Sequence, residues 1–85
     1  MRILYTSKFV RDYKKLPVPA KDFAERNERL FRENPFNPSL RTHKLGGKWE
    51  GFWSFSIGYR YRIIFEFGPD GVVYFHAAGD HNVYQ

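Results

Sequence analysis

Three histidines are the side chains of this 85-residue chain whose type best suits them to carry protons. An imidazole side chain can both take up and release a proton near neutral pH, so each of His43, His76 and His81 could act as a general acid or base. Their spacing suits neither one helix nor one hairpin, and a shared metal site is therefore not expected. His81 follows the last predicted strand, where a site often opens, although a solvated terminal histidine is the simpler interpretation. His76 lies within that strand and is interpreted as structural.

Positive charge is concentrated in the middle of the chain. The net charge is +5 at pH 7, and residues 41–62 contain five basic side chains against one acidic one, whereas residues 63–85 contain no lysine or arginine. The same central segment includes Trp49, Trp53 and Tyr59. Basic side chains interleaved with aromatic rings suit a polyanion with stackable bases, such as RNA or DNA. A basic surface that only keeps the protein in solution is the alternative.

Length and composition bound the class of protein. Eighty-five residues suffice for one domain, and with 42% hydrophobic and 20% aromatic residues the chain can bury enough area to fold, which excludes a disordered tail. The absence of cysteine excludes disulfide scaffolds, thiolate zinc sites and a catalytic thiol. No apolar run approaches the ~18 residues of a membrane span, and no signal peptide is recognisable. A soluble, cytoplasmic single domain is therefore expected, without a phosphate loop, dinucleotide fingerprint or calcium loop.

The N-terminal half predicts one strand and two helices. Residues 2–6 are rich in β-formers, and Ser7 is the expected N-cap of a helix that Pro17 ends after about two turns. Pro19 suits the first position of a second helix, which an Asn-Pro step ends. The expected apolar stripe of that helix consists of Ala20, Phe23, Ala24, Leu30 and Phe31. Residues 35–42 are expected to form a loop.

The second half predicts three strands, at residues 52–57, 61–67 and 72–78, separated by glycine-containing turns. The order β-α-α-β-β-β indicates an α+β fold, in which the two N-terminal helices pack on one face of a small, mostly antiparallel four-stranded sheet. The long helical segment after the first strand allows that strand to pair parallel with a later one.

Alternation along the strands predicts their register. One strand places Trp53, Phe55 and Ile57 on one face, and the next begins its apolar set at Tyr61. If both sets face the helices, Ile57 lies opposite Tyr61 across a three-residue turn. A turn of even length would expose one of the two sets, and each large side chain left exposed would lose about 1.5–3 kcal/mol of burial free energy. The face away from the helices is then lined by Ser54, Ser56, Arg60 and Arg62. The two guanidinium groups on this open sheet surface are expected to form an anion clamp.

Three segments of the chain resemble the RelE/ParE superfamily of toxins. They are residues 40–57 (LRTHKLGGKWEGFWSFSI), residues 59–65 (YRYRIIF) and residues 79–84 (GDHNVY). These toxins belong to bacterial and archaeal type II toxin–antitoxin pairs, and the resemblance covers residues 1–85 as a single toxin domain. The carboxy-terminal histidine makes the chain more similar to the RNA-cleaving branch (RelE, YafQ and YoeB) than to the gyrase-poisoning branch.

The resemblance implies a ribosome-associated mRNA endoribonuclease, or mRNA interferase, that inhibits translation. In the family reaction the ribose 2′-hydroxyl attacks the adjacent phosphate and expels the 5′-oxygen, which requires a base, an acid and positive charge. Because the substrate supplies the nucleophile, no metal or other cofactor is expected. The expected partners are mRNA, the ribosome and a cognate antitoxin whose acidic tail crosses the basic face.

Catalytic residues follow from the same resemblance. His81 matches the terminal catalytic histidine, and Tyr84 matches the nearby aromatic residue that orients or stacks a base. Arg62 matches the strand arginine that faces the scissile phosphate, with Arg60 as a further phosphate contact. His43 falls where related toxins place a histidine or a glutamate.

The central basic segment is then the expected RNA-binding strip. Lys44 and Lys48 are the expected phosphate contacts. Trp49 is either a stacking surface or part of the core, and the register assigns Trp53 to the core.

The chain departs from some relatives at three positions. Ser54 and Ser56 stand where those relatives have an acidic residue and a histidine, and Arg60 stands where they have an acid. Serine is not a general base near neutral pH, so the base is His81 or His43, and which of them takes the proton stays open. The alternative functions are a non-catalytic binder of a protein target such as DNA gyrase, and an RNA-binding module without turnover.

Overall fold

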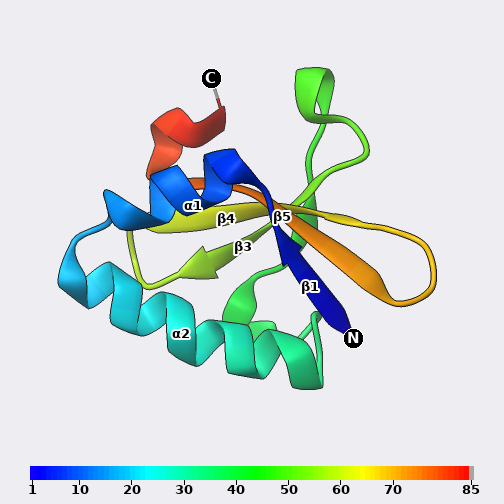
Figure 1. The fold of residues 1–85 in the computed structure, drawn as a ribbon, viewed down its shortest axis with the longest axis horizontal. Coiled ribbons are helices and arrows are strands. Elements are labelled where there is room, and N and C mark those ends of the chain that lie inside the picture. The colour runs from blue at the N-terminus through cyan, green and yellow to red at the C-terminus, as the bar shows by residue number, and fades with distance from the viewer. Residues whose placement is uncertain (85) are drawn as a thin grey trace.

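A computed structural model describes residues 1–84 and shows two helices packed against one five-stranded sheet (Figure 1). The helices are α1 (Ser7–Lys14) and α2 (Val18–Glu33). The strands are β1 (Arg2–Tyr5), β2 (His43–Lys44), β3 (Trp53–Ile57), β4 (Tyr61–Phe67) and β5 (Val72–Gly79), and their order in the sheet is β1-β5-β4-β3-β2. Short 3-10 turns occupy Pro38–Leu40, Gly47–Trp49 and His81–Tyr84, and the last is called the C-terminal turn.

The sheet has the predicted topology and one additional edge strand. β1 pairs parallel with β5, while the other neighbours pair antiparallel. Ile57 lies opposite Tyr61, so the turn of residues 58–60 has the three-residue length that alternation predicted. The prediction of four strands was one short, because β2 contains two residues and is too short to show a period.

The N-cap of α1 is Thr6 rather than the predicted Ser7. Thr6 has extended backbone (φ −71°, ψ 161°), and its Oγ1 accepts a hydrogen bond from the Phe9 N–H at 3.1 Å. Ser7 is already the first helical residue, so it cannot take that role. The helix ends at Lys14, before Pro17, as the sequence predicted.

α2 has a narrower buried face than its sequence predicted. It begins at Val18, one residue before the predicted Pro19. Its buried residues are Ala20, Ala24 and Phe31, with Leu30 partly buried beside them. Phe23, expected in the stripe, is 38% exposed, because it lies at the margin of the buried face, with its ring against the turn at Gly58. Asn27 lies one helical turn further along and donates from Nδ2 to the Ser56 carbonyl at 2.7 Å.

The main core lies between the helices and one face of the sheet, here called the helix face. Phe31 of α2 stacks on Phe55 with ring centroids 4.8 Å apart and meets Phe65 and Phe75 edge-on at 4.9 and 5.5 Å. All four rings have no solvent exposure. Offset-stacked and edge-to-face contacts are the favourable arrangements for aromatic rings. Trp53, which was predicted to lie in the core, is partly buried and packs against the margin of this cluster.

A β-bulge in β5 explains the irregular alternation of that strand. Phe65 pairs with Phe75 and the preceding Ile64 pairs with Ala77, so His76 is the extra residue. Ala77 is buried but lies outside the main core, on the side of the sheet away from the helices. One extra residue changes the face to which the following side chains point. A strict period of two could not predict this change.

Candidate functional site

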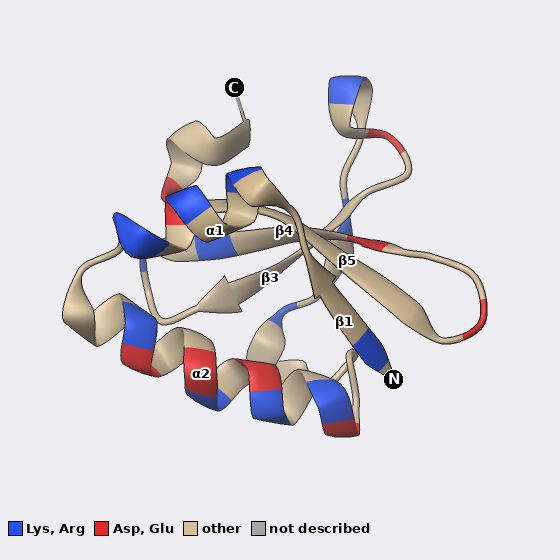
Figure 2. Cartoon of the chain, viewed as in Figure 1, with Lys and Arg blue, Asp and Glu red and all other residues tan. Residues whose placement is uncertain are grey.

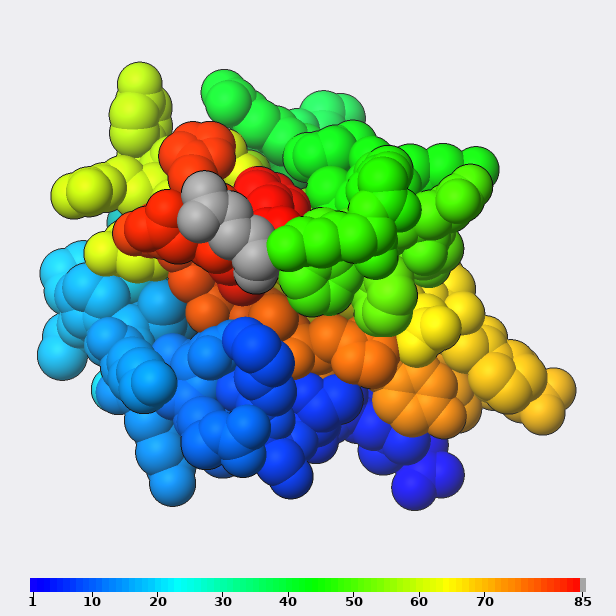
Figure 3. All heavy atoms as spheres, turned by 90° about the horizontal axis from the view of Figure 1, so that it is seen from above, coloured from blue at the N-terminus to red at the C-terminus, as the bar shows by residue number. Residues whose placement is uncertain are grey.

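The sheet face away from the helices, here called the far face, carries Ser54, Arg62 and Ile64. The C-terminal turn covers part of it. Tyr84 Oη forms a hydrogen bond with Ser54 Oγ at 2.8 Å, and Trp49 Nε1 donates to the Tyr84 carbonyl at 2.7 Å. Figure 3 shows the turn, in red, lying beside the β2–β3 loop, in green. The prediction of an open sheet surface was therefore wrong at Ser54, which is 0% exposed, and it was also wrong at Ser56, which is 7% exposed.

A hollow of about 530 Å³ opens beside the C-terminal turn. Side chains from β2, the β2–β3 loop, β4 and the turn converge on it. Six of the predicted site residues line it, namely His43, Lys48, Trp49, Arg62, His81 and Tyr84. Leu45 and Gly46, which the sequence did not single out as site residues, complete the wall. Two imidazoles, a guanidinium and an ammonium group thus share one concave surface, and the described residues that line it include no carboxylate.

Backbone carbonyls orient two of these groups. His43 Nδ1 lies 3.0 Å from the carbonyl of Arg41, a residue with a left-handed φ of 53°. In the neutral imidazole this bond places the proton on Nδ1 and leaves the Nε2 lone pair free to accept another. Arg62 Nη1 donates to the Tyr61 carbonyl at 2.9 Å, and the guanidinium retains further N–H groups for an anion. The hollow therefore combines a proton acceptor with an anion-binding group.

His81 stands at the start of the C-terminal turn, in a tightly bonded stretch of backbone. Asp80 Oδ1 accepts the Asn82 N–H at 2.9 Å, and the Asp80 carbonyl accepts the Val83 N–H at 3.0 Å. The bond from the Asn82 N–H to the Asp80 side chain forms an Asx turn, which fixes the backbone on both sides of the histidine. The imidazole is thus exposed on a defined element of the chain.

A second hollow, of about 230 Å³, shares His81 with the first. It is lined by Tyr59, Arg60, Asp80, His81 and Asn82. Arg60 belongs to the β3–β4 turn, since β4 begins at Tyr61. Arg60 and Arg62 therefore line different hollows, and the predicted clamp of two guanidinium groups in one place is not formed. The turn takes Arg60 out of the strand alternation on which that prediction rested.

Lys44 is separated from the main hollow although it follows His43. Adjacent residues of a strand point to opposite faces. Lys44 pairs with Trp53, and its Nζ lies 5.5 Å from the centre of that ring. Trp53 meets Phe36 and Phe67 edge-on, each at 5.5 Å. The structure therefore places Lys44 with an aromatic cluster on the helix face rather than with Lys48.

His76 and Trp49 both pack against the ring of Phe52. His76 Nε2 lies 2.9 Å from Glu66 Oε1, and its ring meets Phe52 edge-on at 5.0 Å. Phe52 in turn meets Trp49 edge-on at 5.4 Å. This geometry agrees with the structural role predicted for His76. Trp49 lies outside the main core, and its N–H holds the C-terminal turn.

Basic side chains lie on several elements around the site. Figure 2 shows lysine and arginine on α1, α2, the β2–β3 loop and β4, and each of these elements also carries at least one acidic residue. Within residues 1–84, no group of three or more histidine, aspartate or glutamate side chains could hold a metal ion. Over the same residues, neither helix combines the length and the apolar character that crossing a membrane requires.

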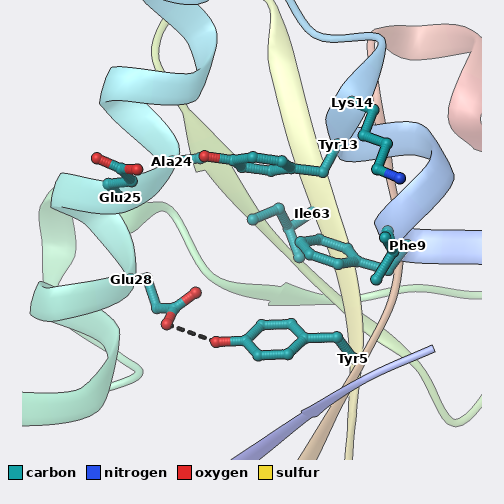
Figure 4. A pocket seen from close by; sticks show the side chains of 9 residues that line it. Tyr5, Phe9, Tyr13, Lys14, Ala24, Glu25, Glu28 and Ile63 are labelled. Atoms are coloured by element: carbon teal, nitrogen blue, oxygen red, sulfur yellow. Dashed lines mark hydrogen bonds between the residues drawn. The ribbon is translucent and has the colours of Figure 1, made fainter. Parts of the chain in front are cut away.

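A different hollow, of about 450 Å³, lies between α1 and α2 (Figure 4). Its walls are largely apolar and aromatic, with Phe9, Tyr13 and Ile63 among them. At its edge Tyr5 Oη donates to Glu28 Oε2 at 2.7 Å. Burial, reinforced by this hydrogen bond, raises the pKa of Tyr5. The described residues that line this groove include none of those predicted for catalysis or RNA binding.

Sequence and structure comparisons relate the chain to known proteins. Over residues 3–81 the sequence matches the family described as ParE toxin of type II toxin–antitoxin system, parDE. The chain is similar in structure to YafQ from E. coli strain BL21(DE3), with a TM-score of 0.80, 20% identity, and coverage of 99% of this chain and 98% of YafQ. A search of curated proteins by sequence found no match.

Two further structural matches have the same fold. A YoeB/ParE toxin from Agrobacterium tumefaciens gives a TM-score of 0.78 at 19% identity, covering 95% of this chain and 99% of that toxin. A chain of the E. coli DinJ–YafQ toxin–antitoxin complex gives 0.76 at 20% identity, covering 94% of this chain and 91% of its own length. At these identities the matches show a shared architecture.

Proposed function

This chain belongs to the ParE toxin family of type II toxin–antitoxin systems, and we propose that it is a ribosome-associated endoribonuclease that cleaves messenger RNA and thereby inhibits translation. The observation that carries this proposal is the convergence of His43, Arg62 and His81 on one hollow. A general base, a general acid and a fixed positive charge are the groups that this reaction needs. The similarity to YafQ and YoeB toxins gives further support.

The proposed reaction uses the ribose of the substrate as nucleophile. A base removes the 2′-hydroxyl proton, O2′ forms a bond to phosphorus, and the bond from phosphorus to O5′ breaks. An acid donates a proton to O5′, so the products are a 2′,3′-cyclic phosphate and a 5′-hydroxyl. The nucleophile therefore needs no metal ion to generate it.

Hydrogen bonding supports an assignment of the two histidines. His43 is the proposed base, because its Nδ1 contact with the Arg41 carbonyl leaves Nε2 free to accept a proton. His81 is the proposed acid, because it is exposed and lines both hollows, so that it can meet the leaving oxygen. Arg62 stabilises the negative charge that develops on the phosphate oxygens.

Tyr84 and Lys48 have supporting roles in this proposal. Tyr84 is bonded through Oη to Ser54 and through its carbonyl to Trp49, which makes it a positioning residue for the turn that carries His81. Lys48 is exposed at the mouth of the hollow and pairs with a phosphate of the bound strand.

The partner of a type II toxin is its cognate antitoxin, and one matched structure is a toxin–antitoxin complex. We expect an acidic segment of that antitoxin to cross the basic far face. Such a segment would neutralise the toxin by covering the hollow that His81 and Arg62 line.

A second candidate is a non-catalytic inhibitor of a protein target such as DNA gyrase. The description of the matched family favours it, as do Ser54 and Ser56 at positions where some relatives have an acid and a histidine. This candidate predicts a DNA-damage response rather than translation arrest. It also predicts that His81→Ala has no effect.

Expression without antitoxin tests the leading proposal. His81→Ala and Arg62→Ala should each relieve growth arrest and restore protein synthesis while leaving the melting temperature close to that of the wild type. His76→Gln is the matched control, since His76 lines neither hollow and should leave toxicity intact. Unchanged toxicity in both hollow variants would count against the ribonuclease.

A further inference from the structure

The turn between β3 and β4 carries the most exposed large apolar side chain of residues 1–84. Tyr59 is 96% exposed, compared with 68% for Val18 and 53% for Phe36. Burying such a ring would be favourable, so a fully exposed aromatic side chain is an unusual feature of a folded surface. The reason for its exposure lies in how the turn is built.

The register of the sheet and the packing beneath the turn hold Tyr59 outward. The pairing of Ile57 with Tyr61 makes Tyr59 the middle residue of a three-residue turn. Gly58 has a φ of 75°, and a Cβ at this position would lie 2.9 Å from the ring of Phe23. Phe23 therefore already fills the space under the turn. The ring of Tyr59 does not take part in that packing and projects from the turn into solvent.

Tyr59 also lies next to the proposed acid. It lines the second hollow together with Arg60, Asp80, His81 and Asn82. His81 lines this hollow and the main one, which holds His43 and Arg62. The two hollows therefore meet at the imidazole that is proposed to protonate the leaving oxygen.

Three side chains of the second hollow match the parts of an unpaired nucleotide, while the carboxylate of Asp80 is engaged with the Asn82 N–H at 2.9 Å. An exposed aromatic ring stacks on any base, because every base has a π-face. A guanidinium binds phosphate, and Arg60 is exposed in the same turn. The side-chain amide of Asn82 offers both donors and an acceptor to the edge of a base.

We propose that the β3–β4 turn is a second nucleotide subsite, in which the ring of Tyr59 stacks on the base of the nucleotide that leaves and Arg60 pairs with the phosphate on the 3′ side of that nucleotide. This inference rests on the proposed ribonuclease function. RNA on the two sides of the scissile phosphate then occupies the two hollows, with His81 between them. Tyr59 sets affinity for the single strand and does not take part in proton transfer.

Binding of a non-cleavable RNA tests the subsite directly. The probe is a short single-stranded RNA with 2′-O-methyl riboses, measured by fluorescence anisotropy with the full chain. Tyr59→Ala should raise its Kd about tenfold, or about 1.4 kcal/mol, which lies within the range for base–aromatic stacking. Tyr59→Phe keeps the ring and should stay within about twofold of the wild type. Val18→Ala, which truncates an exposed side chain that lines neither hollow, should bind as the wild type does.

A second probe with the same phosphates but without bases separates stacking from charge. Wild type and Tyr59→Ala should bind this abasic strand equally, whereas Arg60→Gln should weaken binding of both probes. Equal losses on both probes for Tyr59→Ala would overturn the stacking role. So would unchanged RNA binding combined with weaker antitoxin binding, which would make the turn an antitoxin contact.

Cleavage on programmed ribosomes distinguishes failure of this inference from failure of the proposed function. If the wild type cleaves and Tyr59→Ala has the same kcat/KM, the subsite is wrong and the ribonuclease stands. If the wild type does not cleave but Tyr59→Ala still weakens binding of the RNA and not of the abasic strand, RNA binding at the turn stands and the ribonuclease is wrong.

Discussion

The two faces of the sheet are built by different means. The helix face is covered by two helices around the fully buried rings of Phe31, Phe55, Phe65 and Phe75. Part of the far face is covered by a four-residue turn, which Tyr84 holds through two hydrogen bonds. Apolar burial is the dominant favourable contribution to folding. Stability is therefore concentrated on the helix face, and the proton-carrying and anion-binding groups lie on the far face.

Removing the central ring of the helix face should have the largest effect on stability. Phe31→Ala leaves a cavity among three other rings and should lower the free energy of unfolding by about 3–5 kcal/mol. Urea denaturation followed by circular dichroism measures this loss. A change below about 1 kcal/mol would show that the core does not depend on this residue.

The link between α1 and the end of β5 should have the next largest effect. Asp12 Oδ2 accepts the Ala78 N–H at 3.0 Å and also pairs with Lys8 at 2.7 Å. Asp12→Ala leaves that buried N–H without its partner and should cost about 1–3 kcal/mol. Lys8→Ala is the control and should cost less than about 1 kcal/mol, because Lys8 is exposed. Equal losses in the two variants would assign the effect to the ion pair.

On the far face, a small loss of stability should accompany a larger loss of activity. Ser54→Ala removes the hydrogen bond to Tyr84 Oη and should cost about 0.5–1.5 kcal/mol in unfolding. Ser54 is fully buried and cannot touch RNA, so any fall in cleavage must act through the turn that carries His81. Trp49→Phe removes the other bond to this turn and should act in the same direction. Full cleavage activity in both variants would contradict the positioning role of Tyr84.

The smallest expected effect is a pH dependence on the helix face. Burial, and then the hydrogen bond to Glu28, raise the pKa of Tyr5 above 10.0, so the folded protein keeps this proton when the unfolded chain has lost it. The free energy of unfolding therefore falls as the pH rises from 10 through the raised pKa. Tyr5→Phe should make this decline shallower, leaving the contribution of Tyr13, whose pKa burial also raises. Identical slopes for wild type and Tyr5→Phe would contradict the assignment.

The helix face could be predicted from the sequence because one physical rule governs it. Strict alternation and the burial of apolar side chains correctly predicted that Ile57 pairs with Tyr61 and that Phe55 and Phe65 point toward the helices. On α2 the same rule is less exact, because polar residues also enter the buried face. The sequence predicts Phe23 in the buried stripe, whereas the structure leaves it 38% exposed at the margin, and the polar Asn27 on the same face binds a strand carbonyl.

The far face could be predicted only in part. The residue types were found, and six of the predicted side chains line one hollow. The arrangement depends on contacts between distant residues, such as Trp49 with Tyr84, that no local period reveals. The bulge at His76 and the position of Arg60 in a turn likewise break the alternation. Tyr59 was noted as an aromatic residue in a basic segment, but its neighbours in the fold were needed to suggest a role.

The ends of the cleaved RNA test the central claim most directly. The purified protein is incubated with programmed ribosomes, using a natural message and the same message with a 2′-deoxyribose at the cleaved position. The proposed reaction predicts fragments with 2′,3′-cyclic phosphate and 5′-hydroxyl ends, and no cleavage at the deoxyribose. Intact natural message, or cleavage that persists at the deoxyribose, would contradict it.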